Sequence, residues 1–321
     1  MKFTKLPLNG ASWADELLYT FDTEFAEPID VIVDIINSDT REIIGQQRLR
    51  GVTTGSINIA PYIRSKMQAL QVAPSLDRPI SISPSSIVIS LRCNGTWSDS
   101  RLFFRATYDP LRPAIISQYV ATQRMKHDGI IALTATATNI VAVEFKTAFA
   151  DHTSTMRYTL NAAGRPVDIV IPLGSSYREA RSVTLTLTCD SIKRTITYNI
   201  EQMPEGRQLL WYNSRGGIET YPFPTALRVS DTAHVRTVAT KEYTANTLIS
   251  RTSVVRLLSA FERRNELERI ADIINSPDIF EATTTALKPV ELNRRTVEYD
   301  KHGTIHQASI EIREYRKGGR R

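Results

Sequence analysis

The stretch from Val183 to Ile200 reads Val-Thr-Leu-Thr-Leu-Thr-Cys-Asp-Ser-Ile-Lys-Arg-Thr-Ile-Thr-Tyr-Asn-Ile. In its first half every second residue is apolar, and threonine stands at each position between. Successive side chains of a strand point to opposite faces of a sheet, so this period of two predicts a strand with one buried face. The alternation returns after a short turn at Asp190-Ser191. The stretch therefore predicts a hairpin in a half-buried antiparallel sheet.

The same period recurs through the middle of the chain. Alternating apolar residues mark further strands near 141–145, 156–160 and 167–172. Short strands at close spacing, rich in threonine and β-branched residues, are typical of an antiparallel sandwich. No strand alternates with a long helix, as it would in a parallel α/β fold. We therefore expect an immunoglobulin-like β-sandwich domain over residues 111–204.

Strand patterns also fill the N-terminal region. Residues 29–36 put isoleucine and valine on one face and two aspartates on the other. A second strand is predicted at Ile87–Cys93, and Asn94-Gly95 after it is the preferred pair for a type I′ hairpin turn. The prolines within 109–113 remove backbone donors and end the pattern. We therefore place an N-terminal β domain at residues 1–110.

The last part of the chain, residues 205–321, contains the one helix that the sequence predicts. From Arg263 to Asn275, apolar residues recur at spacings of three and four on one face. Strands are expected before it, near 246–258, and after it, between about 290 and 312. The predicted fold class is thus mainly β, with antiparallel β-sandwich domains and one notable helix, near 263–275, in a C-terminal β domain that ends in a basic tail.

The composition is that of a folded protein. The 321 residues are 41% hydrophobic and 23% charged, with a formal net charge of +6. These values exclude wholesale disorder, and the charge is too weak to indicate nucleic-acid binding by itself. Two cysteines exclude a disulfide-built secreted scaffold, and we expect both as buried thiols. The sequence shows neither a signal peptide nor an apolar stretch long enough for a membrane span, so synthesis in a cytoplasm is expected.

The sequence contains no recognisable catalytic motif. It has neither a Gly-x-Ser-x-Gly elbow nor a Walker A loop. Its five histidines are scattered, and the one close pair, His302 and His306, stands at an expected turn. A metal site needs three or four converging ligands. We therefore predict a protein that is not an enzyme, with no catalytic residues, no cofactor and no metal.

Two C-terminal features are candidate contact surfaces. The aromatic hairpin 209–223 is open to three interpretations: a protein interface, a sugar-stacking platform or a hydrophobic core hairpin. The last nine residues hold five basic side chains and one acidic one, which suits either an acidic partner or phosphate, or else a solvated, frayed terminus. The candidate assembly-interface residues are Trp211, Tyr212, Tyr221, Phe223, Arg316, Lys317, Arg320 and Arg321.

The hairpin segment from Leu209 to Phe223 reads Leu-Leu-Trp-Tyr-Asn-Ser-Arg-Gly-Gly-Ile-Glu-Thr-Tyr-Pro-Phe. It resembles a motif in a family of structural proteins encoded by phages and prophages of Bacteroidetes, although Ile218-Glu219 departs from the more usual aromatic or acidic pair after the glycines. Residues Ile57–Arg64 are similar to that family's early strand and short turn. Residues from Leu267 to Phe280, followed by Lys288-Pro289-Val290, are similar to its late helix, turn and Pro-Val strand. The resemblance implies a virion component that works by self-assembly.

We therefore expect a non-enzymatic structural component of a phage virion, a tail, hub or baseplate subunit that forms a homo-oligomer and contacts other virion proteins. A ring needs a heterologous interface, so each subunit would carry two different contact patches. The alternative is a β-sandwich adhesin that recognises a host-surface glycan. A sandwich-fold hydrolase is a third hypothesis, which no sequence feature favours. Nucleic acid could contact the basic C-terminus, but no motif favours that either.

Overall fold

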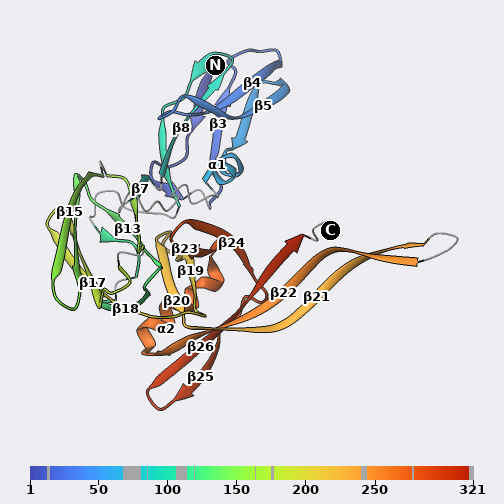
Figure 1. Ribbon diagram of the computed structural model, residues 1–321. Coiled ribbons are helices and arrows are strands. Elements are labelled where there is room, and N and C mark those ends of the chain that lie inside the picture. The colour runs from blue at the N-terminus through green and yellow to red at the C-terminus, as the bar shows by residue number, and fades with distance from the viewer. Residues whose placement is uncertain are drawn as a thin grey trace.

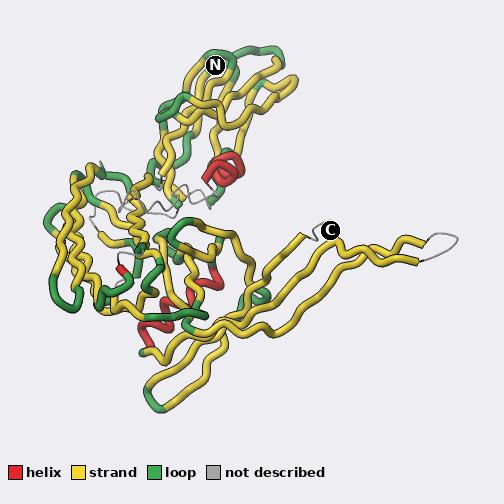
Figure 2. Tube along the Cα trace, in the orientation of Figure 1, coloured by secondary structure: helices red, strands yellow, loops and turns green. Residues whose placement is uncertain are grey.

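The computed structural model is built largely of strands, with helix confined to short segments (Figures 1 and 2). It describes residues 1–12, 15–67, 81–84, 86–105, 114–118, 120–162, 164–174, 177–239, 244–276 and 278–317. The chain is 63% strand and 8% helix. The predicted mainly-β fold class, with antiparallel sheets and a helix near the C-terminus, is therefore confirmed.

The first body is a sandwich of two sheets, ordered β1-β3-β6 and β2-β10-β8-β4-β5. Its strands are β1 (Lys2–Lys5), β2 (Ala11–Ser12), β3 (Leu18–Asp22), β4 (Ile29–Asn37), β5 (Glu42–Val52), β6 (Thr54–Asn58), β8 (Ser86–Cys93), β9 (Thr96–Trp97) and β10 (Arg101–Phe104). The apolar face predicted for β4 is correct, because Val31, Val33 and Ile35 are buried between the sheets. The opposite face is only partly solvated, since Asp34 and Ile36 are buried as well. Asn94 and Gly95 both have positive φ, as the predicted turn requires.

The helix α1 (Ala60–Met67) corrects the short turn expected after the strand at residues 57–59. The Asn58 side chain accepts hydrogen bonds from the N–H groups of Leu17 and Ala60, and so binds one of the otherwise unpaired donors at the helix start. Pro61 stands in the first turn, where its missing N–H has no partner to lose. Ile63 then points into the sandwich core. One buried face and a satisfied first turn are enough to form this helix.

The second body is a sandwich with the same strand order. Its sheets run β11-β13-β16-β7 and β12-β18-β17-β14-β15. Its strands are β7 (Ser81–Pro84), β11 (Ala114–Ile115), β12 (Thr122–Lys126), β13 (Ile130–Thr136), β14 (Ile140–Ala148), β15 (Thr153–Asn161), β16 (Val167–Pro172), β17 (Ser182–Cys189) and β18 (Ile192–Glu201). The hairpin predicted from 183–200 is β17–β18. In each sandwich one edge strand of the second sheet runs parallel to its neighbour: β2 to β10 in the first, and β12 to β18 in the second. The two strand orders match an immunoglobulin-like arrangement.

The two cysteines occupy equivalent places in the two sandwiches. Cys93 ends β8 and pairs with Val33 of β4, while Cys189 ends β17 and pairs with Val141 of β14. Both are buried, free thiols, as predicted. Burial raises the pKa of Cys93 to about 12 and that of Cys189 to about 11. Neither thiol is therefore ionised near neutral pH.

The residue after each cysteine has the same structural role. Asn94 and Asp190 both adopt positive φ. The side chain of Asn94 accepts the N–H of Ile32 at 2.9 Å, and that of Asp190 accepts the N–H of Ile140 at 3.1 Å. Each side chain thus ties the turn to the neighbouring strand, which indicates that the two sandwiches are structural repeats.

Strand β7 departs from the predicted domain division. It lies within the range 1–110 but pairs antiparallel with β16, in the second sandwich. The short β7 thus adds an edge strand to the neighbouring body. The predicted break at 109–113 lies outside the described residues.

The third body is a sheet ordered β20-β19-β23-β24-β26-β22-β21, with β25 paired to β26. Its strands are β19 (Arg207–Tyr212), β20 (Ile218–Phe223), β21 (Thr225–Ala239), β22 (Thr244–Glu262), β23 (Ile279–Thr283), β24 (Ala286–Leu292), β25 (Glu298–His302) and β26 (Ile305–Lys317). The predicted helix is present as α2 (Arg264–Ala271), which continues as a 3-10 turn over Asp272–Asn275. Strand β22 is longer than the expected 246–258, and β21 was not expected.

The third body packs directly on the second sandwich (Figure 1). Every residue of β13 is buried. Alternate residues such as Ile131 and Leu133 fill the sandwich core. The opposite face of β13 shares a cluster with the third body, made of Ile130, Ala132, Val170, Leu210, Tyr212, Ile218, Phe280 and Ala282. Both faces of the sheet are therefore covered, one by its own sandwich and one by β19, β20 and β23.

Candidate functional site

The aromatic side chains of the β19–β20 hairpin are inside the protein. Trp211, Tyr212, Tyr221 and Phe223 are each 3% exposed or less. The hairpin lies between the second sandwich and the rest of the third body, so both of its faces are covered. In this fold these side chains offer no surface to a partner, and the core-hairpin interpretation is the one that their burial fits.

The basic residues of the predicted interface lie at the far end of β26. The backbone of Arg316 pairs with Arg251 and that of Lys317 with Ser250, both in β22. This part of the predicted tail is therefore strand. Arg320 and Arg321 lie outside the described residues.

Polar groups bind the hairpin to the second sandwich. The Ser117 hydroxyl donates to the Ile218 carbonyl oxygen, and the Gln118 N–H donates to Glu219 Oε1, each at 2.5 Å. Gly217 allows this approach, because a Cβ there would lie 2.8 Å from backbone atoms of both Ile116 and Ser117. The contact therefore needs a residue without a side chain.

An arginine from the first body joins the same junction. Arg105 Nη2 donates to Asp168 Oδ2 at 3.0 Å, and its guanidinium carbon lies 3.9 Å from the centre of the Tyr212 ring. Asp168 in turn accepts the Thr134 hydroxyl at 2.6 Å. One guanidinium thus contacts groups from the second and third bodies.

A buried ionic triad links helix α2 to strand β20 of the hairpin. Arg269 of α2 donates through Nε to Glu266 Oε2 at 2.8 Å and through Nη1 to Glu219 Oε2 at 3.4 Å. Burial raises the pKa of Glu219 to about 7, and the Arg269 guanidinium opposes that rise. Breaking such a triad by removing one member leaves an uncompensated buried charge, which is strongly destabilising. Its position, away from solvent, suits structural support.

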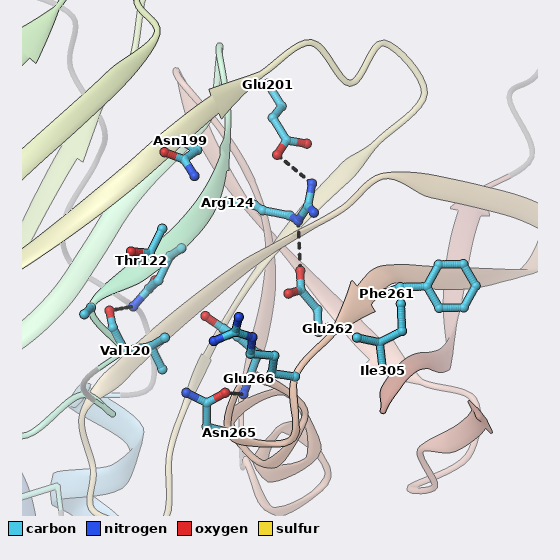
Figure 3. Close-up of a pocket in the computed structure, with 13 residues that line it drawn as sticks. Val120, Thr122, Arg124, Asn199, Glu201, Phe261, Glu262, Asn265, Glu266 and Ile305 are labelled. Carbon is cyan, nitrogen blue, oxygen red and sulfur yellow. Dashed lines mark hydrogen bonds and ion pairs between the residues drawn. The ribbon is translucent and has the colours of Figure 1, made fainter. Parts of the chain in front are cut away.

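A pocket of about 600 Å³ opens where the second sandwich meets the third body, and we call it the junction pocket (Figure 3). Its lining comes from β12, β18, the end of β22, the start of α2 and the start of β26. The lining residues are Val120, Ala121, Thr122, Gln123, Arg124, Asn199, Glu201, Phe261, Glu262, Arg263, Asn265, Glu266 and Ile305.

Arg124 stands at the centre of the junction pocket. Its Nη1 donates to Glu201 Oε1 at 2.6 Å, and its Nε donates to Glu262 Oε1 at 3.1 Å (Figure 3). Glu262 Oε1 also accepts the Tyr221 hydroxyl at 2.9 Å. Burial raises the pKa of Glu262, partly offset by the Tyr221 hydrogen bond and by Arg124. The pocket is therefore polar, charged and partly desolvated.

A metal centre has no support in the described part of the chain. No group of three or more histidine, cysteine, aspartate or glutamate side chains there could hold a metal ion. The carboxylates of the junction pocket instead contact arginines or the Tyr221 hydroxyl.

A pair of strands, β21 and β22, extends from the third body (Figure 1). We call residues 227–239 of β21 and 244–256 of β22 the arm. Strand β21 ends the sheet and pairs with β22 alone among the described strands. Leu227 and Val229 are each 50% exposed. Two register shifts, one at 228–230 and one at 234–235, interrupt the ladder.

Sequence reasoning missed the junction pocket, and of the arm it found only part of β22. Arg124 and Glu262 are 138 residues apart, so no local spacing connects them. The arm carries threonine, serine and arginine, and residues 227–234 of β21 are all exposed, so the apolar alternation that identifies half-buried strands is weak there. Its abundance of threonine and valine was the only available signal.

No protein-family model matches the sequence, and no curated protein matches it significantly. Among solved structures, the chain is similar to extracellular domains 3–5 of Drosophila OTK, with 10% identity and a TM-score of 0.24, over 79% of this chain and 91% of that one. It is also similar to a complex of Dpr2 Ig1-Ig2 with DIP-Theta Ig1-Ig3, with 7% identity and a TM-score of 0.18, over 98% of this chain and 89% of that one. Among the described helices, none is long and apolar enough to cross a membrane.

Proposed function

We propose that the protein is a non-enzymatic assembly subunit, and that its arm contacts a neighbouring copy of the same chain. The single observation that carries this proposal is the arm itself. A two-stranded hairpin is marginally stable alone in water, and an edge strand presents unpaired N–H and C=O groups that favour pairing with another chain. Strand addition of this kind is a common mode of recognition.

The exposed side chains of the arm support the same function. Leu227 and Val229 stand half-exposed on a strand that leaves the body. Asp231, the one acidic residue of the arm, contacts both Arg228 and Arg251. A projecting strand with half-exposed apolar side chains suits a neighbouring protein surface better than an open solvent face.

The setting of this assembly follows from the family resemblance. A structural protein of a phage virion, in the tail, hub or baseplate, works as a homo-oligomer that contacts other virion proteins. A chain with two repeated sandwiches and a projecting arm is suited to that role. We therefore propose a virion location, and particles purified from a producing host should contain this chain by mass spectrometry.

The assembly role is tested by shortening the arm. Thr232 and Thr252 pair across β21 and β22, so an Asn-Gly turn that joins them removes the distal strands and keeps the paired base. Sedimentation velocity should show an oligomer for the full chain and a monomer for the shortened one. The double variant Leu227→Ser/Val229→Ser should weaken the oligomer, whereas Ile140→Ser, at a residue 47% exposed on the second sandwich, should leave it intact. A full chain that stays monomeric at every attainable concentration would overturn the proposal.

One observation favours the adhesin as a second candidate. Trp97 is 53% exposed, and the Arg92 guanidinium lies 5.6 Å from its ring centre. An exposed tryptophan offers a flat face on which a sugar ring can stack. Binding on a glycan array that is lost in Trp97→Ala, with unchanged thermal unfolding, would support this function instead.

A further inference from the structure

The charges of the junction pocket are unbalanced. Three glutamates line it, Glu201, Glu262 and Glu266, against two arginines, Arg124 and Arg263. Arg269, which pairs with Glu266, is shared with Glu219 and so does not remove the excess. Arg124 is shared by two of these carboxylates. The pocket therefore has an excess of negative charge in a partly desolvated space, where electrostatic interactions are stronger than in water.

Glu266 contributes an acceptor that the chain does not use. Its side chain is 7% exposed, and its Oε2 accepts a hydrogen bond from Arg269 Nε. Its Oε1 is buried and has no hydrogen-bond partner among the described residues. A buried carboxylate oxygen without a donor is costly, so a donor that enters from outside would be favoured. Glu266 lies beside Glu262 in the pocket (Figure 3).

The outer part of the pocket is apolar. Phe261 and Ile305 line it and are 42% and 40% exposed (Figure 3). The group that fits such a site has a cationic end, to meet the carboxylates, on an apolar stem, to lie against these two side chains. Arginine and lysine side chains have this build.

We propose that the junction pocket binds a basic side chain from the C-terminal segment of a second copy of this chain. The inference rests on the assembly role proposed above and names one of its contacts. Residues 313–321 carry five basic side chains and one acidic one, which complements the excess of carboxylates in the pocket. Opposite charges of this kind fix the orientation of an interface.

The basic residues at the far end of β26 lie too far from the pocket of their own copy to occupy it. Strand β26 runs from Ile305, which lines the pocket, to Lys317. At about 3.3 Å per residue this distance is roughly 40 Å. Arg316 and Lys317 can therefore reach a junction pocket only in another copy, which makes the contact heterologous, as a ring requires.

The test uses a fluorescent peptide of residues 313–321 as the probe and the full-length chain carrying Arg320→Ala and Arg321→Ala as the receptor, so that the receptor's own terminus competes less. Fluorescence anisotropy should show saturable binding. Glu262→Gln in the receptor should weaken it at least tenfold, and Glu201→Gln should weaken it too. Glu205→Gln, at an exposed glutamate outside the pocket, is the matched control and should leave it unchanged. Thermal unfolding by circular dichroism shows whether each variant is folded.

A second measurement does not depend on changes within the pocket. The full chain with Arg316, Lys317, Arg320 and Arg321 all replaced by alanine should oligomerise less than the wild type in sedimentation velocity. Equal peptide binding by the Glu262→Gln receptor and its parent, or no binding by the parent, would overturn the inference. An oligomer that depends on the arm but not on the basic residues would overturn it too, and would leave the assembly role standing.

Discussion

At Gly217 the third body lies close against the backbone of the second sandwich, and this contact gives a sharp prediction. A Cβ at this position would lie 2.8 Å from the Ile116 carbonyl carbon and from the Ser117 nitrogen. Both are backbone atoms, so no side chain can rotate away. The variant Gly217→Ala must move β20 and residues 116–118 apart by roughly half an ångström or more to restore van der Waals contact.

The expected cost follows from the contacts at this point. Crowding a well-packed site costs about 1–3 kcal/mol. The separation also stretches the hydrogen bonds that Ser117 and Gln118 make to Ile218 and Glu219, each worth about 0.5–1.5 kcal/mol. Gly217→Ala should therefore lower the free energy of unfolding by about 2–6 kcal/mol.

Urea unfolding followed by circular dichroism measures this change, and Gly95→Ala is the control. Gly95 has a φ of +93°, and a Cβ there would meet nothing within 4 Å. Its alanine variant should lose only the cost of the left-handed conformation, about 1–2 kcal/mol. Hydrogen exchange of residues 114–118 should accelerate in Gly217→Ala alone. A loss for Gly217→Ala no larger than that for Gly95→Ala would refute the argument from close approach.

Two further predictions concern buried groups. Trp211→Ala should lower the free energy of unfolding by about 3–5 kcal/mol, because the ring is 1% exposed, whereas Trp97→Ala should change it by less than about 1 kcal/mol; thermal unfolding distinguishes the two. The pKa of Glu219 is raised from 4.5 to about 7, so the folded state holds the proton more tightly and the free energy of unfolding should fall, by up to about 3 kcal/mol, as pH rises from 4.5 to 7. Urea unfolding at pH 5 and pH 7 should show this loss in the wild type and not in Glu219→Gln. An equal change in the free energy of unfolding in both proteins would contradict the prediction.

The sequence predicted strands well wherever one face is buried and the other is solvated. The hairpin at 183–200 is correct because the alternation of apolar residues records that difference locally. The apolar face of the strand at 29–36 is correct too, although part of its other face is also buried. Strand β13 was missed, because burial on both faces removes the alternation. Strand β21 was missed for the opposite reason, because its residues 227–234 are all exposed.

The candidate site was much less accessible to sequence reasoning. The aromatic hairpin looked like a contact surface because its residues are large and clustered, but a sequence does not say which body covers them. The junction pocket was not predicted at all. Its central residue, Arg124, contacts Glu201 and Glu262 from two different bodies.

The sequence alone determined that this is a mainly-β protein with sandwich domains, a C-terminal helix and buried thiols, because each of these depends on the periodicity or composition of a short segment. Tertiary structure alone decided that the two sandwiches share one strand order, that β7 pairs with the neighbouring body and that the hairpin at Trp211 is core. It also decided that carboxylates from separate bodies meet at Arg124. The physical reason is that local periodicity records which face of an element is apolar, while the partner that covers this face is chosen by contacts between residues far apart in the chain.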